Sequence, residues 1–291
     1  MAKFLITGAK GQVGHCLVKQ LEGKAELLAL DRDELDITDK AAVFKTVQTF
    51  QPDVVINAAA YTAVDRAESE TKLADAVNRI GAQHLAEAAK HINAVMLHIS
   101  TDYVFNGENR SAYKENDQTA PQSVYGITKL AGEAAVLQAN PRSIILRTAW
   151  VFGEHGHNFV KTMLRLARTR DSLAVVDDQI GGPTYAGDIA TALIEMAEQI
   201  LAGKTDVFGI YHFSGKPYVS WNEFAQAIFE QANLQKILEK RPLVNRITTQ
   251  EYPTPAKRPA NSCLDLSKIK HTFNIDPSDW RTALQNIKRY L

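Results

Sequence analysis

Short apolar runs alternate with amphipathic segments along the first half of the chain. The runs are apolar on both faces, as in parallel strands covered by helices, whereas the segments between them repeat apolar positions every three or four residues. Such alternation predicts consecutive βαβ units. The expected strands are Lys3–Thr7, Glu26–Asp31, Asp53–Ala59, Ala94–Ser100 and Ser143–Thr148, and the expected helices begin at Gln12 or span about Asp39–Phe50, Leu73–His91 and Val124–Ala139.

The rhythm loosens after Trp150. Six of the ten prolines lie at or beyond residue 217, which predicts a region rich in loops. The expected fold is therefore α/β, a Rossmann-type doubly wound parallel sheet with a smaller, loop-rich C-terminal substrate lobe. The elements expected in this half are helices near Asn158–Arg170 and over Asp188–Leu201, a Gly-Gly-Pro turn at 181–183 and a strand-like run at Tyr211–Ser214.

The composition narrows the classes of partner. Lys+Arg and Asp+Glu number 33 each, so no bulk positive charge attracts nucleic acid or anionic lipid. No apolar run approaches the length of a membrane span, and the N-terminal residues lack the sections of a secretory signal. Only Cys16 and Cys263 occur, which fits a reducing compartment. We expect neither a nucleic-acid nor a membrane partner, and a cytoplasmic location.

A glycine-rich turn, Gly8-x-x-Gly11-x-x-Gly14, stands between the first expected strand and the first expected helix. Glycine permits a tight turn and close approach of the backbone, while a helix N-terminus offers free N–H groups and a positive dipole end to a pyrophosphate. A merely flexible loop is the alternative. The context favours a dinucleotide site, with residues 1–149 as the dinucleotide-binding domain, to which 188–214 returns, and 150–291 as an interleaved substrate-binding lobe.

Charged residues at the end of the second strand address the choice of dinucleotide. Asp31 lies where an acid binds the adenosine ribose, and Arg32 can hold a 2′-phosphate, so we expect NADPH with NADH also accepted. For Arg32 an ordinary exposed charge is the alternative. The residues expected at the cofactor are Gly8, Gly11, Gln12, Val13, Gly14, Asp31, Arg32, Asp36, Ile37, Ala58, Ala59, Ala60, Tyr61 and Thr62, with Tyr125 and Lys129.

Tyr125 and Lys129 stand four residues apart in an expected helix and so share one face. Unit charges about 4 Å apart at an effective dielectric of about 20 interact by about 4 kcal/mol. An ammonium at that distance is expected to lower the pKa of the phenol from ~10 toward ~7, where general acid catalysis is effective. Thr101, just past the fourth strand, is expected to place its hydroxyl beside Tyr125. The three residues form the candidate catalytic group.

Six stretches of the sequence resemble the dTDP-4-dehydrorhamnose reductase family, within the short-chain dehydrogenase/reductase superfamily. They are NAAAYTAVDRAE (57–68), STDYVFNG (100–107), YGITKLAGE (125–133), LRTAWVFG (146–153), NFVKTMLRLA (158–167) and YPTPAKRPANSCLD (252–265). The resemblance implies NAD(P)H-dependent reduction of the 4-keto group of dTDP-4-dehydro-L-rhamnose to dTDP-L-rhamnose. It makes Tyr125 the proton donor, Lys129 the residue that holds the nicotinamide ribose, and Thr101 a modulator of Tyr125.

The same resemblance implies a dTDP-sugar as the partner and contacts to it from Thr101, Asp102, Tyr103 and Trp150. Core packing is the alternative role for Trp150. Arg258, in the proline-rich tail, is a further candidate, because a guanidinium can contact nucleotide phosphates as a fork.

Some members of the family bridge a dimer with magnesium held by glutamates, but the corresponding positions here are Cys16 and Gly187. We therefore expect no such metal site, and a homodimer is left open. The pair His155-x-His157 lies in a glycine-containing stretch without further spaced ligands, so a surface loop is the simpler interpretation.

Three other functions stay open at this stage. Dehydratases and epimerases of sugar nucleotides share the fold and the Tyr/Lys pair, but dehydratases carry a second acid where this chain has Tyr103. A reductase that forms dTDP-6-deoxy-L-talose would need the same residues. A non-catalytic regulatory subunit is the third possibility, because fold does not fix function. Retention of Thr101, Tyr125 and Lys129 favours an active enzyme.

Overall fold

A computed structural model describes all 291 residues and contains a six-stranded parallel sheet. Its strand order is β2-β1-β3-β4-β5-β10. The chain places β2 on one side of β1 and then crosses to the other side, where β3 and the later strands follow, so the strand order reverses at β1. The Rossmann-type fold predicted from the sequence is confirmed; two of the predicted strands, Lys3–Thr7 and Ser143–Thr148, have the predicted bounds, and the ends of the others differ by at most two residues. The strands are β1 (Lys3–Thr7), β2 (Glu26–Leu30), β3 (Val54–Asn57), β4 (Val95–Thr101), β5 (Ser143–Thr148) and β10 (Gly209–His212).

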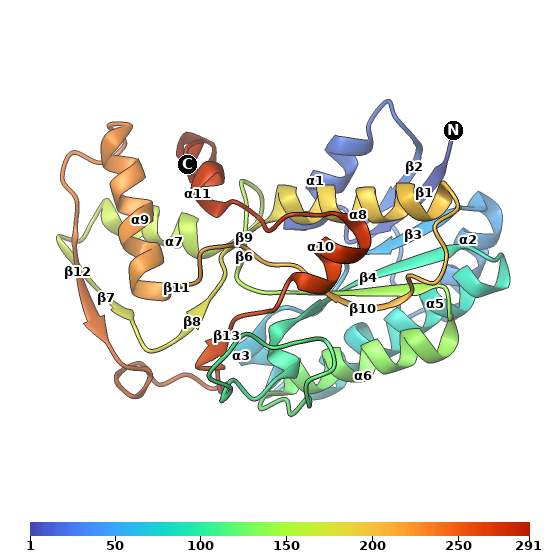
Figure 1. Ribbon diagram of the computed structural model, residues 1–291, viewed down its shortest axis with the longest axis horizontal. Coiled ribbons are helices and arrows are strands. Elements are labelled where there is room, and N and C mark those ends of the chain that lie inside the picture. The colour runs from blue at the N-terminus through green and yellow to red at the C-terminus, as the bar shows by residue number, and fades with distance from the viewer.

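Helices cover both faces of this sheet (Figure 1). Phe4 and Ile6 of β1 pack toward α1, α8 and α10, whereas Leu5 between them packs toward α2, α5 and α6. This alternation follows from the two-residue period of a strand and explains why the strands are apolar throughout. The helices are α1 (Gln12–Leu21), α8 (Ala186–Leu201), α10 (Ser267–Phe273), α2 (Lys40–Phe50), α5 (Ala82–His91) and α6 (Val124–Ala139). No helix combines the length and the apolarity that a membrane crossing requires.

The predicted helix Leu73–His91 is continuous but contains a π-helical turn, η1 (Ala76–Gly81), between α4 (Thr71–Asp75) and α5. A short helix, α3 (Val64–Ala67), precedes it. The π turn was not predicted from the sequence pattern. Such a turn holds one residue more than an α-helical turn, so the helix face on which the following side chains lie is shifted by one residue. Asn78 in this turn is buried and bonds both the backbone of Tyr61 and the hydroxyl of Thr128. The turn therefore connects the loop after β3 to α6.

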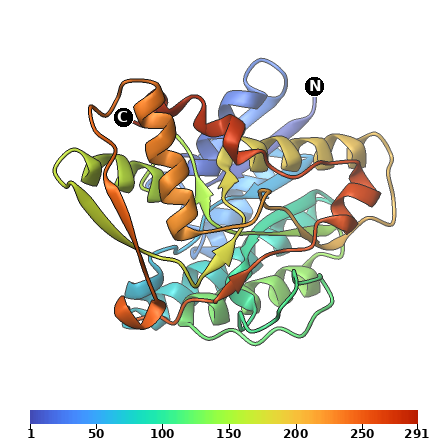
Figure 2. The same ribbon diagram turned by 60° about the vertical axis from the view of Figure 1, so that its left-hand side comes forward.

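The rest of the chain forms a second lobe, which lies at the left of Figure 1 and comes forward in Figure 2. Strands β7 and β12 pair in parallel. They pack with helices α7, α9 and α11 in an apolar cluster that includes Phe224, Phe229 and Trp280. Neither α9 nor these two strands were predicted from the sequence. Their bounds are β7 (Ser172–Val176), β12 (Leu243–Ile247), α7 (Phe159–Ala167), α9 (Trp221–Leu234), α11 (Trp280–Leu284) and the 3-10 turn η4 (Ile287–Tyr290).

Short strands lie between the lobe and the main sheet. Two later elements return to the main sheet: β10 pairs with β5 as its last strand, and α8 packs against α1 on one face. The domain boundaries at 149 and 150 stay a prediction. The short elements are β6 (Val151–Phe152), β8 (Ile180–Gly181), β9 (Thr184–Tyr185), β11 (Val219–Ser220), β13 (Asn261–Ser262), η2 (Asp102–Val104) and η3 (Thr249–Glu251).

A buried ion pair connects α6 to the sheet. Arg147 of β5 donates from Nε and Nη2 to the two carboxylate oxygens of Glu133 at 2.9 and 2.6 Å, and each side chain is only 2% exposed. Ser100 of β4 donates its hydroxyl to the same carboxylate at 2.5 Å. The pairing offsets the cost of burying both charges, and it fixes α6 against two strands.

Removal of one partner of this ion pair should be strongly destabilising. For Glu133→Gln we expect the free energy of unfolding to fall by about 3–5 kcal/mol, because the Arg147 charge stays buried without its counterion. Urea unfolding measures the change. Asp75→Asn is the matched control: it breaks the part-exposed pair with Arg79 and should cost less than about 1 kcal/mol. Equal losses in the two variants would contradict the assignment.

Candidate active site

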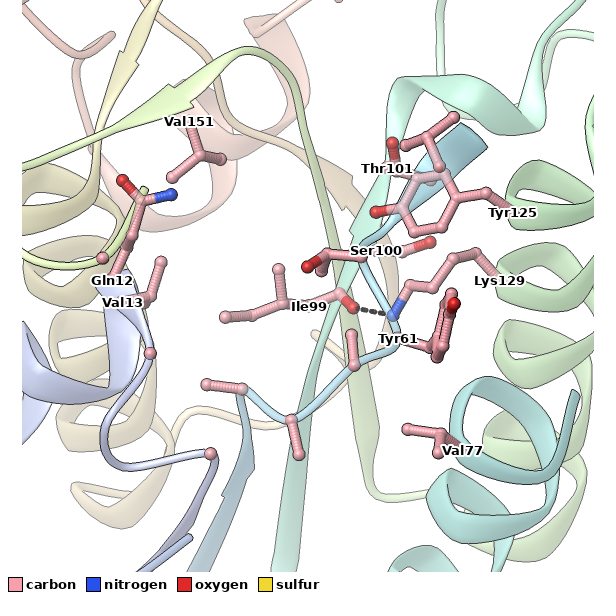
Figure 3. A pocket seen from close by; sticks show the side chains of 18 of the residues that line it. Gln12, Val13, Tyr61, Val77, Ile99, Ser100, Thr101, Tyr125, Lys129 and Val151 are labelled. Carbon is pink, nitrogen blue, oxygen red and sulfur yellow. Dashed lines mark hydrogen bonds between the residues drawn. The ribbon is translucent and has the colours of Figure 1, made fainter. Parts of the chain in front are cut away.

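A cavity of about 770 Å³ opens at the carboxyl ends of the sheet strands, at the point where the strand order reverses. Ligands bind at this place in open α/β sheets. Most residues predicted from the sequence line it: Gly8, Gly11, Gln12, Val13, Asp31, Arg32, Asp36, Ile37, Ala58, Ala59, Ala60, Tyr61, Thr62, Thr101, Asp102, Tyr103, Tyr125, Lys129 and Trp150. Gly14 and Arg258 do not. Figure 3 shows Gln12 and Val13 facing Tyr125 and Lys129 across the cavity.

The glycine turn is shaped by close backbone contacts. Gly8 has φ of +70°, and a Cβ there would stand 2.6 Å from the backbone nitrogen of Ala59. A Cβ on Gly14 would overlap the carbonyl oxygen of Gly8, so Gly14 brings α1 close to the turn instead of lining the cavity. Gly11 is the N-cap of α1, whose first turn carries no acidic side chain. The N-terminus of α1 and the absence of side chains at Gly8 and Gly11 fit a dinucleotide pyrophosphate.

The predicted adenosine-binding residues lie at the far end of the cavity from Tyr125. Asp31 and Arg32 follow β2 directly, and both line the cavity. Asp36 accepts hydrogen bonds from the backbone and hydroxyl of Thr38 through its Oδ1, and these bonds lower the pKa of its carboxyl group. Ile37 packs against the π turn at Gly81. The loop after β2 is therefore held in place on both sides.

Tyr125 lies in the first turn of α6, where Ser123 caps the helix by accepting the N–H of Gly126. A Cβ on Gly126 would overlap the carbonyl oxygen of Tyr103, so glycine lets the helix start close to η2. As a result the rings of Tyr103 and Tyr125 meet edge to face, with centroids 5.4 Å apart. The Tyr125 hydroxyl points into the cavity beside Thr101 (Figure 3).

The expected pKa of Tyr125 is wrong in this geometry. Burial raises the pKa of the phenol to about 12, and hydrogen bonding with Thr101 opposes the rise. The ammonium of Lys129 does not lower it, because that group donates instead to the carbonyl oxygen of Ile99 at 2.6 Å (Figure 3). A phenol with this pKa keeps its proton at neutral pH and so stays available as a general acid. Burial also lowers the pKa of Lys129 to about 8.

Thr101 and Asp102 form a buried polar group next to Tyr125. Thr101 donates its hydroxyl to Asp102 at 3.0 Å and accepts the N–H of Tyr103. The other carboxylate oxygen of Asp102 accepts the hydroxyl of Ser262, which lies on β13 within the stretch 252–265. Burial raises the pKa of Asp102 to about 6, although these hydrogen bonds lower it. Through Ser262 the tail is thereby joined to the end of the cavity where Tyr125 lies.

Trp150 lines the cavity and stacks on a second tryptophan. Its ring centroid lies 3.6 Å from that of Trp221 with an angle of 11° between the planes. Trp221 comes from the start of α9 in the second lobe, and sequence analysis missed it because α9 was not recognised. The capping box formed by Ser220 and Glu223 was the available signal. The two lobes thus share one aromatic wall of the site.

Arg258 binds another residue instead of facing the cavity. Its guanidinium donates to both carboxylate oxygens of Asp65, at 3.0 and 2.8 Å, and to the carbonyl oxygen of Ala256. A contact with nucleotide phosphates stays a prediction.

The positions considered for a shared metal lie near each other. Cys16 is buried in α1, and one turn later Gln20 donates to the carbonyl oxygen of Gly187 at 2.9 Å. The structure contains no group of three His, Cys, Asp or Glu side chains placed to hold a metal ion. The ring of His155 packs against that of His15, with centroids 3.4 Å apart and an angle of 34° between the planes. The expectation of no metal stays a prediction.

Comparisons with known proteins agree with this geometry. A family model described as the RmlD substrate binding domain matches residues 2–290. The chain is 60% identical to a dTDP-4-dehydrorhamnose reductase of Aggregatibacter actinomycetemcomitans, over 100% of this chain and 99% of that protein. It is 39% identical to the protein of the same name from Escherichia coli (strain K12), over 98% and 96% of the two chains.

Solved structures give the same result. The fold matches a dTDP-4-dehydrorhamnose reductase of Clostridium acetobutylicum with a TM-score of 0.91 and 42% identity, covering 98% of this chain and 97% of the other. A reductase of the same name from Bacillus anthracis, in complex with NADP, matches with a TM-score of 0.91 and 36% identity over 98% of each chain. From its sequence, its fold and the residues that line its cavity, the chain belongs to the dTDP-4-dehydrorhamnose reductase family.

Proposed function

We propose that this protein reduces the 4-keto group of dTDP-4-dehydro-L-rhamnose to give dTDP-L-rhamnose, with Tyr125 as the proton donor. The observation that carries the proposal is the placement of Tyr125 and Lys129 across one cavity from the glycine turn. The relatives with this name cover the whole chain, and one was solved with NADP. Bound in the cavity, NADPH or NADH would supply the hydride.

The residues of the chain provide the proton and the orientation of the substrate. Tyr125, protonated at neutral pH, gives its phenolic proton to the oxygen of the reduced carbonyl. Thr101 lies beside the phenol, and its hydroxyl, turned from Asp102 to the substrate, would donate to the same oxygen and hold the keto group in place. Lys129, on the same helix face and lining the same cavity, would hold the nicotinamide ribose.

The substrate end of the cavity suits a deoxysugar. Tyr103 and Trp150 present aromatic surface, while Thr101 and Asp102 supply polar contacts. A raised pKa, to about 6, lets Asp102 exchange its proton in the physiological range, although Ser262 and Thr101 already bond it. Tyr103 stands where elimination would need a second carboxylate, which favours reduction over dehydration.

Location and assembly belong to the same proposal. Two buried cysteines, both free thiols, support a cytoplasmic location. A homodimer stays a prediction that light scattering would test.

Loss of the phenolic hydroxyl should abolish most of the reduction. For Tyr125→Phe we expect kcat to fall by about 10²- to 10⁴-fold, the usual contribution of a positioned acid. The assay follows NADPH absorbance with dTDP-4-dehydro-L-rhamnose generated in place, and chromatography with a dTDP-L-rhamnose standard identifies the product. NADPH binding, followed by fluorescence, should change far less than kcat, because the other residues expected at the cofactor stay in place. An enzyme with full activity and phenylalanine at position 125 would overturn the assignment of the acid.

The reaction should slow at alkaline pH. The pKa of Lys129 is lowered to about 8, so its charge is present below that pH and is lost as pH rises through it. We expect kcat/KM for NADPH to decline through pH 8, up to tenfold per unit. Lys129→Arg is the control, because a guanidinium keeps its charge over this range. Its profile should stay level there, whatever its absolute rate; a decline near pH 8 in both enzymes would assign the titration to another group.

Arg32 should distinguish the two cofactors. A charged hydrogen bond to the 2′-phosphate contributes about 1.5–3 kcal/mol. Arg32→Ala should therefore raise the KM for NADPH at least about tenfold and leave the KM for NADH nearly unchanged. Lys24→Ala is the control, since this lysine follows α1 and does not line the cavity. Parallel changes in both KM values would exclude a 2′-phosphate contact.

A further inference from the structure

A buried histidine, His98, lies directly behind the catalytic lysine and outside the cavity lining. It belongs to β4, is 1% exposed, and its Nε2 stands 3.4 Å from Nζ of Lys129. Its other ring nitrogen, Nδ1, stands 3.0 Å from Nδ2 of Asn57 at the end of β3. Which ring nitrogen of His98 carries the proton therefore affects the amine of Lys129.

The side-chain amide of Asn57 has only one orientation that satisfies its neighbours. Its Oδ1 accepts the backbone N–H of Ala59 at 3.0 Å and the hydroxyl of Thr7 at 2.8 Å. The opposite orientation would set an NH₂ group against the N–H of Ala59, two donors facing each other. The amide must therefore present its NH₂ to His98.

This orientation fixes the tautomer of the histidine. Nδ1 has to accept the Asn57 donor, so it carries no proton, and the neutral ring holds its proton on Nε2. A charged ring would place two donors against each other at Nδ1, and full burial beside Lys129 lowers the pKa of His98 well below its ordinary value. The Nε2–H bond is thus directed at Lys129.

An ammonium on Lys129 faces this N–H as donor against donor, whereas the neutral amine can accept it. Few other titratable side chains lie near the Lys129 amine. From α6 it faces Tyr125 and Glu133, and the Glu133 carboxylate is already paired with Arg147 of β5. From the loop after β3 it faces the phenol of Tyr61 (Figure 3). The single acceptor bonded to its amine is the carbonyl oxygen of Ile99, at 2.6 Å.

We propose that His98, held as the Nε2–H tautomer by Asn57, is a positioning residue that directs the Lys129 amine toward the Ile99 carbonyl and eases loss of its proton. The chain Thr7–Asn57–His98 is no proton pathway, because the Asn57 amide between the other two members is not an acid or a base in the physiological range and does not relay protons. Its role is to set the highest pH at which Lys129 stays charged. Only the catalytic consequence rests on the proposed function.

The test reads His98 and Lys129 by NMR in the full-length protein, with ¹⁵N-labelled histidine and ¹³Cε-labelled lysine and without substrate. Lys129→Arg assigns the Lys129 signal by its absence. We expect a proton on Nε2 and none on Nδ1 of His98, and titration of Lys129 near pH 8. His98→Phe removes the opposing N–H without adding charge and should raise the pKa of Lys129 by about one unit.

Two further variants complete the test. His212→Phe is the matched control, because His212 is equally buried, on β10, and bonds the carbonyl oxygen of Tyr113 away from Lys129. It should leave the Lys129 titration unchanged. In Asn57→Asp a carboxylate replaces the NH₂ donor, so the His98 proton should move to Nδ1.

A proton on Nδ1 in the wild type, or an unchanged Lys129 pKa in His98→Phe, would overturn the proposal. In activity assays, His98→Phe should shift the alkaline decline of kcat/KM to higher pH by the same amount as the pKa of Lys129, about one unit. If the protein failed to oxidise NADPH with any dTDP-keto sugar, only the proposed reaction would be contradicted. The NMR result does not depend on turnover and would stand.

Discussion

The buried pair between Glu133 and Arg147 is the interaction on which the geometry of the site depends. It joins the middle of α6 to β5, and Ser100 extends the same network to β4. Tyr125 and Lys129 lie one to two turns earlier on that helix, so their positions relative to the strand ends follow from this anchor. Glycines at 126 and 132 complete the arrangement, because a Cβ at either would overlap a carbonyl oxygen of the facing backbone.

Burial then sets the acid–base properties of Tyr125 and Lys129, the two groups proposed to act in catalysis. It raises the pKa of the phenol and lowers that of the lysine, so at neutral pH Tyr125 is protonated and Lys129 is charged. A proton donor needs its proton, and a buried phenol retains it better than an exposed one. The second lobe has a different task, since Trp221 and Ser262 bring its aromatic surface and the tail to the substrate end of the cavity.

Local patterns predicted much of the fold and of the cavity lining. Fully apolar strands and periodic helices indicate a covered parallel sheet, and such a sheet brings the carboxyl ends of its strands to one edge. Glycine and strand-end residues from widely separated segments, such as Gly8, Ala59 and Thr101, could therefore be placed in one site from sequence alone. The second lobe was harder, because its short strands and α9 join the core through contacts between distant parts of the chain.

The sequence by itself determined the fold class, the glycine turn and the identity of the Tyr/Lys pair, since each depends on residues close together in the chain. Only the tertiary structure decided which way Lys129 points, how far burial shifts the pKa of Tyr125, and that Arg258 binds Asp65. It also revealed the π turn with Asn78 and the stack of Trp221 on Trp150. The physical reason is that desolvation and hydrogen-bond partners are supplied by residues far away in sequence, so no local spacing records them.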